Sequence, residues 1–364
     1  MRTLVGSILL TISQWYAFFL FSQLSFIEFN VVIGSIIFVL GFIARMLGSI
    51  IFGYIGDRVN RRVALILTDV TLAISSIIVL IPNNIYPLII SRLLQGLSLG
   101  GEWGGASTII IEVYSEHKFR GFITSLLQLS VPIGIILSSL TILVINYYVI
   151  YWPYSFLAVT FLSLLSLLLV RDVSTQKVAR SKTQPLLEAI RHDWANILKS
   201  IGIKISESAN FYIFTSYIFT KSSSISFLSL IVIISISFQL FLIPLFGYLS
   251  DLVGRRKVII IGLILMMTAG IVLTRNLLPG EILMSVSDSA LYAPQSSIFT
   301  EIFDKKYRFT ASNFSYQVAS ILGGSLAPVL LRTNQSSLLL ITLSYVLVTF
   351  ISVILITETK GKKI

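Results

Sequence analysis

Cysteine is missing from this sequence, and charged residues are scarce. None of the 364 residues is Cys, which excludes disulfides, thiolate nucleophiles and cysteine metal sites. The two histidines, His117 and His192, fall in polar segments, so we interpret them as surface residues rather than metal ligands. A Walker phosphate-binding motif is also absent. We therefore expect no metal and no cofactor.

Only 12% of the residues are Asp, Glu, Lys or Arg, whereas 55% are hydrophobic. A soluble domain has about a quarter charged residues, so this chain cannot cover a surface that faces water. Long apolar runs, such as 4–27 and 31–52, reach the roughly 20 residues that a helix needs to cross a bilayer. A membrane β-barrel would instead show alternating segments of about ten residues. The sequence therefore predicts an all-α membrane protein, whose first helix is too long for a signal peptide.

Polar, Gly, Pro and basic clusters divide the chain into twelve predicted transmembrane helices. Their expected ranges are 4–28, 31–54, 63–81, 86–112, 120–146, 153–171, 197–220, 224–248, 258–275, 279–302, 310–331 and 337–357. The longest polar stretch, 172–196, is predicted to be a cytoplasmic linker. It would join a six-helix bundle at 1–171 to a second one at 197–364.

Basic residues predict the orientation. Of the 27 Lys and Arg residues, 21 fall on the side of both termini, and only Lys221, Arg275 and Arg332 fall on the other side. Cytoplasmic loops carry an excess of Lys and Arg, so we expect both termini in the cytoplasm and the chain in the inner or plasma membrane. The charge of +11 is spread over seven short segments, which argues against a nucleic-acid surface.

Two short motifs repeat between the halves. Gly53-Tyr-Ile-Gly-Asp57-Arg-Val-Asn-Arg61-Arg62 returns, with six of ten positions identical, 194 residues later. Both copies lie in predicted cytoplasmic loops, so the two bundles repeat in parallel. Glycine permits close helix contact, and the Asp can pair with Arg or cap a helix N-terminus. Such a contact suits a gate that holds in one conformation and releases in another. The predicted gating residues are Gly53, Asp57, Arg61, Arg62, Glu112, Arg120, Gly247, Asp251, Arg255, Arg256, Glu301 and Arg308.

Four segments carry a family resemblance. They are Gln14-Trp-Tyr-Ala-Phe, Arg45-Met-Leu-Gly leading to Asp57, Arg92-Leu-Leu-Gln-Gly leading to Glu102 and Glu112, and Tyr292-Ala-Pro-Gln leading to Tyr316-Gln-Val-Ala. The sequence thereby resembles the metabolite:proton symporter branch of the major facilitator superfamily, which is related to the sugar transporters. The resemblance implies two six-helix bundles and a substrate such as citrate, 2-oxoglutarate, shikimate, proline or betaine, moved with protons.

The chain departs from that pattern in its first helix. Gln14 and Ala17 stand where the family has two acids, and Asn60 stands in place of a loop glycine. Proton coupling would then depend on another group. Charges inside membrane spans are costly and mark functional hypotheses. We expect Glu102, together with Glu207 or Asp288, to carry the proton. Asp69 has no family counterpart and is as consistent with a structural role.

The substrate is predicted to be a small organic acid or zwitterion, because an arginine fork binds carboxylate in a bidentate way. The predicted substrate-binding residues are Tyr16, Arg45, Arg92, Tyr212, Gln295 and Gln317. Lys204 and Glu207 lie three apart on one helix face, and a structural pair between them is the alternative to a functional role.

Three other functions stay open. A proton-independent facilitator or sugar-type uniporter fits the missing acids. A membrane enzyme would need a convergent catalytic set, which the sequence does not show, and a sensor would carry an added signalling domain. The leading hypothesis is a monomeric secondary transporter that works by alternating access, with lipid, solute and protons as its partners.

Overall fold

The computed structural model describes residues 2–81, 85–170, 184–220, 224–333 and 337–362, and these residues are helical without any strand. In chain order the helices are α1 (Arg2–Ile27), α2 (Val31–Arg58), α3 (Arg61–Ile78), α4 (Ile85–Val113), α5 (Arg120–Gln128), α6 (Ser130–Tyr148), η1 (Trp152–Ser155), α7 (Phe156–Val170), α8 (Pro185–Thr215), η2 (Tyr217–Thr220), α9 (Ile225–Ser237), α10 (Gln239–Val253), α11 (Arg255–Leu273), α12 (Leu277–Tyr292), α13 (Gln295–Glu301), α14 (Arg308–Ala319), η3 (Ser320–Ser325), α15 (Leu326–Thr333) and α16 (Leu338–Leu355).

Within these described residues the helices form twelve rods, because four pairs or triplets continue one another: α5 with α6, α9 with α10, α12 with α13, and α14 with η3 and α15. Seven of the described helical segments are apolar and long enough to cross a membrane by length and composition alone. The predicted all-α fold of twelve transmembrane helices is confirmed. Helices satisfy every backbone hydrogen bond internally, as a bilayer requires.

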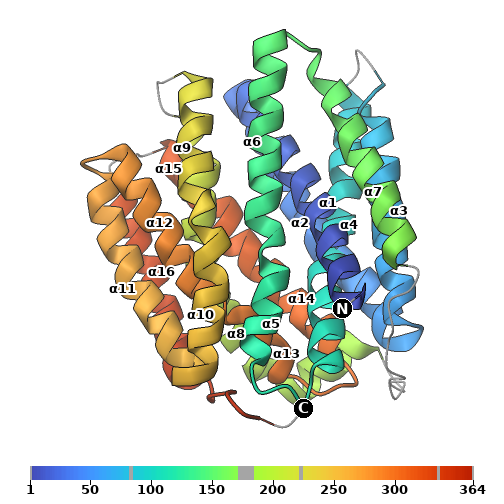
Figure 1. Cartoon of the computed structure of the whole chain (residues 1–364), viewed down its shortest axis with the longest axis vertical. Coiled ribbons are helices and arrows are strands. Elements are labelled where there is room, and N and C mark those ends of the chain that lie inside the picture. Colours follow the sequence, from blue (N-terminus) through green and yellow to red (C-terminus); the bar gives the residue numbers. More distant parts are fainter. Residues whose placement is uncertain (1, 82–84, 171–183, 221–223, 334–336, 363–364) are drawn as a thin grey trace.

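Figure 1 shows two groups of rods side by side. The helices up to α7, drawn in blue to green, form what we call the N half, and α8 to α16, drawn in yellow to red, form the C half. Across the divide, α2 and α4 pack on α14, α5 packs on α10, and α6 packs on α9. The contact between the halves is therefore helix against helix over the length of the rods.

Four predicted single helices are broken in the structure. The fifth changes direction at Leu129, three residues before Pro132. Proline lacks an N–H and clashes with the carbonyl four residues earlier, so a break of this kind is expected there. Pro244 and Pro294 lie close to the corresponding breaks after α9 and α12. In the eleventh rod the pair Gly323 and Gly324 lies in a π-helical turn, η3, which interrupts the α-helix.

The central segment is only partly as predicted. Helix α8 begins at Pro185, so the end of the predicted linker 172–196 is helical, with a kink at Asp193. Residues 171–183 lie outside the described part of the chain. Tyr307, in the turn after α13, donates a hydrogen bond of 2.7 Å to Asp193. Burial, followed by the Asp193 carboxylate, raises the pKa of the Tyr307 hydroxyl.

Two asparagines start helices. The side chain of Asn30 accepts from the N–H of Ile33, and that of Asn60 accepts from the N–H of Arg62 at 2.8 Å. Asn60 is the residue that replaces the family's loop glycine, and here it is the N-cap of α3. The loop motif therefore keeps its turn by capping rather than by glycine flexibility.

Candidate functional site

A cavity lies between the two halves near the middle of the rods. It is almost filled in this conformation, with about 10 Å³ left open, and every side chain that lines it is buried. The N half contributes Trp15, Arg45 and Val131 to its wall, and the C half contributes Lys204, Glu207, Ser208, Phe211, Tyr212, Tyr292, Tyr316 and Ser320. Two cations and one carboxylate therefore face a small space walled by aromatic rings.

Arg45 reaches across from α2 to the C half. Its Nε donates to Gln317 at 2.8 Å, and one terminal nitrogen donates to the Tyr212 hydroxyl at 3.2 Å. Its guanidinium also lies 5.1 Å from the centre of the Trp15 ring, a cation–π contact. Three of the predicted substrate-binding residues, Arg45, Tyr212 and Gln317, therefore form one connected group.

Lys204 and Glu207 form an ion pair on α8, as the structural alternative supposed. The pair nevertheless lines the cavity, and the Lys204 ammonium lies 4.2 Å from the Tyr316 ring centre. Asp288 stands behind it, where it accepts from Gln239 at 2.9 Å and interacts electrostatically with Lys204. The C half thus supplies two acids and one cation next to the space.

Aromatic layers close the cavity at both ends. On one side, Tyr212 packs edge-on against Phe42 and Phe38, with ring centres 4.9 Å and 6.0 Å apart. On the other side, Trp103 of the N half stacks on Tyr316 of the C half at 3.9 Å. Both layers join the two halves, so the cavity is occluded in this conformation.

The repeated loop motifs meet at one end of the rods, and each motif reaches into the opposite half. We call Asp57, Arg61, Glu112, Arg308 and Thr310 the N clasp. Asp57, at the end of α2, accepts from the backbone N–H of Thr310 at 2.8 Å and from its hydroxyl at 2.7 Å. It therefore caps the first turn of α14 in the C half, where the helix dipole favours a negative charge.

Charge pairs complete the N clasp. Glu112 forms an ion pair with Arg61 of its own half and lies 3.7 Å from Arg308 of the other half. Arg61 is 3.8 Å from Asp57. A Cβ added at Gly53 would lie 3.0 Å from the Thr310 backbone, so this glycine allows the close approach.

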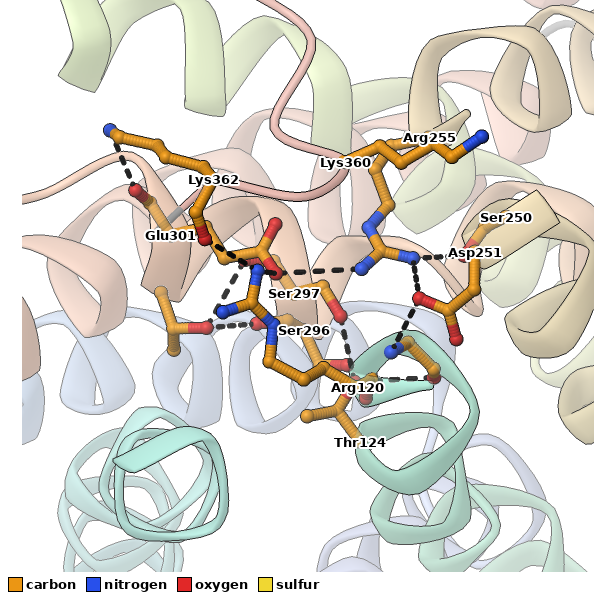
Figure 2. Close-up of polar contacts among 12 residues, drawn as sticks. Arg120, Thr124, Ser250, Asp251, Arg255, Ser296, Ser297, Glu301, Lys360 and Lys362 are labelled. Atoms are coloured by element: carbon orange, nitrogen blue, oxygen red, sulfur yellow. Dashed lines mark hydrogen bonds and ion pairs between the residues drawn. The ribbon is translucent and has the colours of Figure 1, made fainter. Parts of the chain in front are cut away.

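The C clasp consists of Asp251, Arg255, Glu301, Arg120 and Gly121, and Figure 2 shows it. Asp251, at the end of α10, accepts from the N–H groups of Gly121 at 3.0 Å and Phe122 at 2.9 Å. It therefore caps α5 of the N half, as Asp57 caps α14. A Cβ at Gly247 would lie 2.3 Å from the Ser125 hydroxyl.

The charge pattern of the C clasp repeats that of the N clasp. Glu301 lies 3.4 Å from Arg255 of its own half and 3.3 Å from Arg120 of the other half. Arg255 also lies 2.6 Å from Asp251. The prediction that the motif Asp pairs with Arg or caps a helix is confirmed at both sites, since each does both.

The chain segment after α16 lies on the C clasp and not on the N clasp. Arg120 donates to the carbonyl of Lys362 at 2.7 Å, and the Lys362 ammonium donates to the carbonyl of Glu301 at 2.9 Å. Glu358 accepts from the N–H groups of Arg255 and Arg256, both at 3.1 Å. A polar groove of about 680 Å³ adjoins this region.

Other predicted site residues lie away from the cavity wall. Arg92 is fully buried, and it donates to Gln95, to Ser22 and to the carbonyls of Phe18 and Ile37. All of these bonds lie inside the N half. The Tyr16 hydroxyl pairs with Thr141 at 2.9 Å.

Gln295, Glu102 and two arginines are also placed outside the wall. Gln295 is buried at the start of α13. Glu102 accepts from Thr11 inside the N half. The side chain of Arg256 donates to the carbonyls of Val353 and Ile354, whereas Arg62 donates its backbone N–H to Asn60.

Sequence reasoning missed several wall residues. Lys204 carried a usable signal, because a lysine inside an apolar span is rare. Trp15 and Ser320 carried none, since an aromatic or small residue in a span is ordinary packing. The partners of the motif acids, Thr310 and Gly121, were also missed, because they lie far away in the sequence.

Two connected helical halves, an occluded cavity between them and crosswise clasps at one end define a polytopic membrane transport protein. The chain belongs to the Major Facilitator Superfamily, whose family model matches residues 3–220 and 200–363. The chain is therefore a membrane transporter of small organic solutes and not an enzyme.

Relatives of known name support this assignment. The chain is 30% identical to the inner membrane metabolite transport protein YhjE of Escherichia coli K12, over 92% of this chain and 88% of that protein. It is 26% identical to the shikimate transporter of the same organism, over 90% of this chain and 86% of that protein. It is 25% identical to the E. coli K12 proline/betaine transporter, over 81% of this chain and 68% of that protein.

Proposed function

We propose that the chain is a secondary transporter that moves a small organic acid or zwitterion together with a proton, by alternating access. The observation that carries this proposal is the cavity between the halves, with Arg45 and Lys204 on opposite walls. A planar guanidinium binds carboxylate in a bidentate way, and aromatic walls favour an apolar or cationic remainder of the solute. Shikimate, proline and betaine, which the relatives' names mention, all carry a carboxylate.

The charge on the cavity wall narrows the substrate class. In this conformation the wall residues nearly fill the cavity, which leaves about 10 Å³ open, so we take the charge and not the volume as the guide. Arg45 and Lys204 outnumber Glu207 on the wall, so a single carboxylate on the solute would balance the charge. We infer a solute with one carboxylate.

The way the halves meet supports alternating access. The clasps hold the halves together at one end of the rods, and the Phe42–Tyr212 contact joins them on the other side of the cavity. Rocking the halves about the cavity would release one end at a time. From the distribution of Lys and Arg we propose that the clasp end, with both termini, faces the cytoplasm.

The proton is assigned to Glu102, with Glu207 and Asp288 as the acids nearer the solute. Glu102 is fully buried in α4 and forms no ion pair within the described residues. A buried carboxyl group of this kind takes up a proton more readily than an exposed one. The two-half arrangement, with the proton site in one half and the cavity shared, suits symport.

The experiment is uptake into proteoliposomes of purified protein with labelled shikimate, proline and glycine betaine. A pH gradient, acid outside, should drive accumulation of at least one of them above equilibrium. Arg45→Lys keeps the charge but loses the fork, so uptake should fall about tenfold. Arg58→Lys, on the same helix but outside the cavity, should transport like the parent protein.

A proton-independent facilitator is the second candidate, because Gln14 and Ala17 replace the acids of helix 1. It predicts uptake that equilibrates and does not change when the pH gradient is collapsed. Accumulation that disappears on collapse would exclude it. Absence of transport with all three solutes and with a wider panel of organic acids would contradict the proposed substrate class.

A further inference from the structure

Two acids lie inside the N half without a basic partner. Asp69 of α3 and Glu102 of α4 have no accessible surface, and Glu102 feels the charge of Asp69. Among the described residues no ion pair involves either of them, whereas Asp57, Glu112, Glu207, Asp251 and Glu301 are all ion-paired. Two unpaired carboxylates so placed are costly, and uptake of a proton removes the cost.

The charged side chains on the helices packed against α3 and α4 have other partners. Helix α7 contains no Asp, Glu, Lys or Arg. On α2, Arg45 bonds to Gln317 and Tyr212, Asp57 pairs with Arg61, and Arg58 bonds to Tyr54. On α3 the nearest charge is Arg62, seven residues or about 10.5 Å along the helix. On α4, Arg92 and Glu112 are each ten residues or about 15 Å from Glu102. The two acids therefore depend on each other and on hydroxyl groups.

Each hydroxyl group around the acids has more acceptors within hydrogen-bond distance than it has hydrogens to donate. Thr11 lies within hydrogen-bond distance of Glu102 Oε1 and of the carbonyl of Ser7, at 2.7 Å. A hydroxyl has one hydrogen, so it can donate to only one of these acceptors. If Glu102 carries a proton, the carboxyl donates to Thr11 and Thr11 donates to Ser7. Each hydrogen then has one acceptor.

The same count applies at Asp69. Ser166 lies within hydrogen-bond distance of Asp69 Oδ2 and of the carbonyl of Ser163, at 2.8 Å. Ser163 in turn is 2.8 Å from Asp69 Oδ1 and 3.0 Å from the Asp69 carbonyl. A proton on Asp69 Oδ2 would again give each hydrogen one acceptor. Meanwhile Glu102 Oε2, fully buried, has no hydrogen-bond partner within the described residues.

We propose that Asp69 and Glu102 form one two-carboxylate proton site, in which Asp69 shares the coupling proton with Glu102. This inference rests on the proposed function and assigns a residue that has no counterpart in the family pattern. Helix α1 links the site to the solute, because Thr11 contacts Glu102, Ser13 contacts Asp69, and Trp15 lines the cavity below Arg45. When the site gains or loses the proton, the contacts of Thr11 and Ser13 with the two acids change. Because both residues lie on α1, the cavity wall at Trp15 changes with them.

The first test is infrared difference spectroscopy on purified full-length protein stepped through pH, which detects the C=O stretch of protonated carboxyl groups. The parent protein should lose such bands as pH rises. Asp69→Asn should remove one band and shift the pH midpoint of the band that Glu102→Gln removes. Asp304→Asn, an exposed acid on a turn, is the control and should change neither. An unshifted Glu102 midpoint in Asp69→Asn would overturn the shared site.

The second test separates this inference from the proposed function. In proteoliposomes, Asp69→Asn and Glu102→Gln should each lose accumulation driven by a pH gradient but keep exchange of labelled for unlabelled solute, which shows an intact cavity. The double variant should be no worse than either single one, because one shared proton can be lost only once. Accumulation retained by Asp69→Asn while the parent protein is proton-driven overturns the inference alone. Accumulation driven by a Na⁺ gradient at equal pH would contradict the proposal that the proton is the coupling ion.

Discussion

The two clasps contain the same parts and differ in what surrounds them. In each, an Asp at a helix end caps a helix of the opposite half, and a Glu lies between two arginines. In the N clasp, Arg61 has few other partners. In the C clasp, Arg255 contacts Asp251, Glu301 and Ser250, and the segment after α16 adds further bonds beside a polar groove. The repeat therefore explains why the two clasps share the same parts. The surrounding contacts decide how much each ion pair contributes to holding the halves together.

The largest effect is expected from Arg61→Gln. It leaves Asp57 and Glu112 without their nearest cation in a buried place, and breaking a buried pair costs about 3–5 kcal/mol. The clasp end should open. Because the chain has no cysteine, a single Ser107→Cys next to the Ser296 carbonyl reports opening through its rate of maleimide labelling.

Arg62→Gln is the matched control for that experiment. Arg62 is the next residue, and the bond described for it is made by its backbone, which the substitution keeps. Equal labelling rates in Arg61→Gln and Arg62→Gln would contradict the role of the N clasp.

A smaller effect is expected from Arg255→Gln. Glu301 keeps Arg120 at 3.3 Å, and Asp251 keeps the N–H groups of Gly121 and Phe122. The loss should be about 1.5–3 kcal/mol, the usual contribution of hydrogen bonds to charged groups. The same Ser107→Cys labelling assay should rank this variant between Arg61→Gln and the parent protein. A larger effect here than in Arg61→Gln would reverse the comparison.

Thr310→Val should cost less again. It removes the hydroxyl that donates to Asp57 at 2.7 Å but keeps the backbone N–H at 2.8 Å, so about 1.5 kcal/mol is lost, the lower end for a bond to a charged group. Labelling at Ser107→Cys should rise modestly. Thr310→Ser, which keeps the hydroxyl, should restore the parent rate, and a failure to do so would point to packing instead.

The smallest effect is expected from Lys362→Ala. Arg120 donates to the backbone carbonyl of Lys362, which remains, and only the bond from the ammonium to Glu301 is lost. We expect about 0.5–1 kcal/mol. Higher salt should reduce even this difference, because the adjoining groove exposes the charges to screening. A strong opening of the clasp end in this variant would show that the tail, not the helix caps, holds the C clasp.

Composition and apolar run length were enough to predict an all-α membrane protein, and the repeated motif added the two parallel halves. The motif at Asp57 and Asp251 also predicted its own chemistry, because an acid flanked by arginines at a helix end has few roles. It did not show that each acid crosses to the other half. That depends on packing between residues some 130 to 250 positions apart, such as Asp251 with Gly121 and Asp57 with Thr310.

The candidate site could be predicted only in part, because it too depends on packing between residues far apart in the sequence. Arg45, Tyr212 and Gln317 do meet, and Glu207 lies on the cavity wall. Arg92 looks identical to Arg45 in the sequence, since both are single arginines in apolar spans. Only the structure shows that backbone carbonyls and side chains of its own half already accept from Arg92. A charge in a span thus indicates a polar environment but not its position.

The π-helical turn η3 gives the eleventh rod a means of rotating about its own axis. Its Gly323 lies against the carbonyl of Ile205, and its Ser320 lies 3.5 Å from Arg45. Each α-helical residue turns the chain by about 100°, so tightening the wide turn by one residue would swivel α15 relative to α14 by about that angle. A solute that draws Arg45 away from Ser320 would act directly on the first residue of this turn. Rotation of α15 would then loosen the contacts at that end of the eleventh rod before the two bundles move.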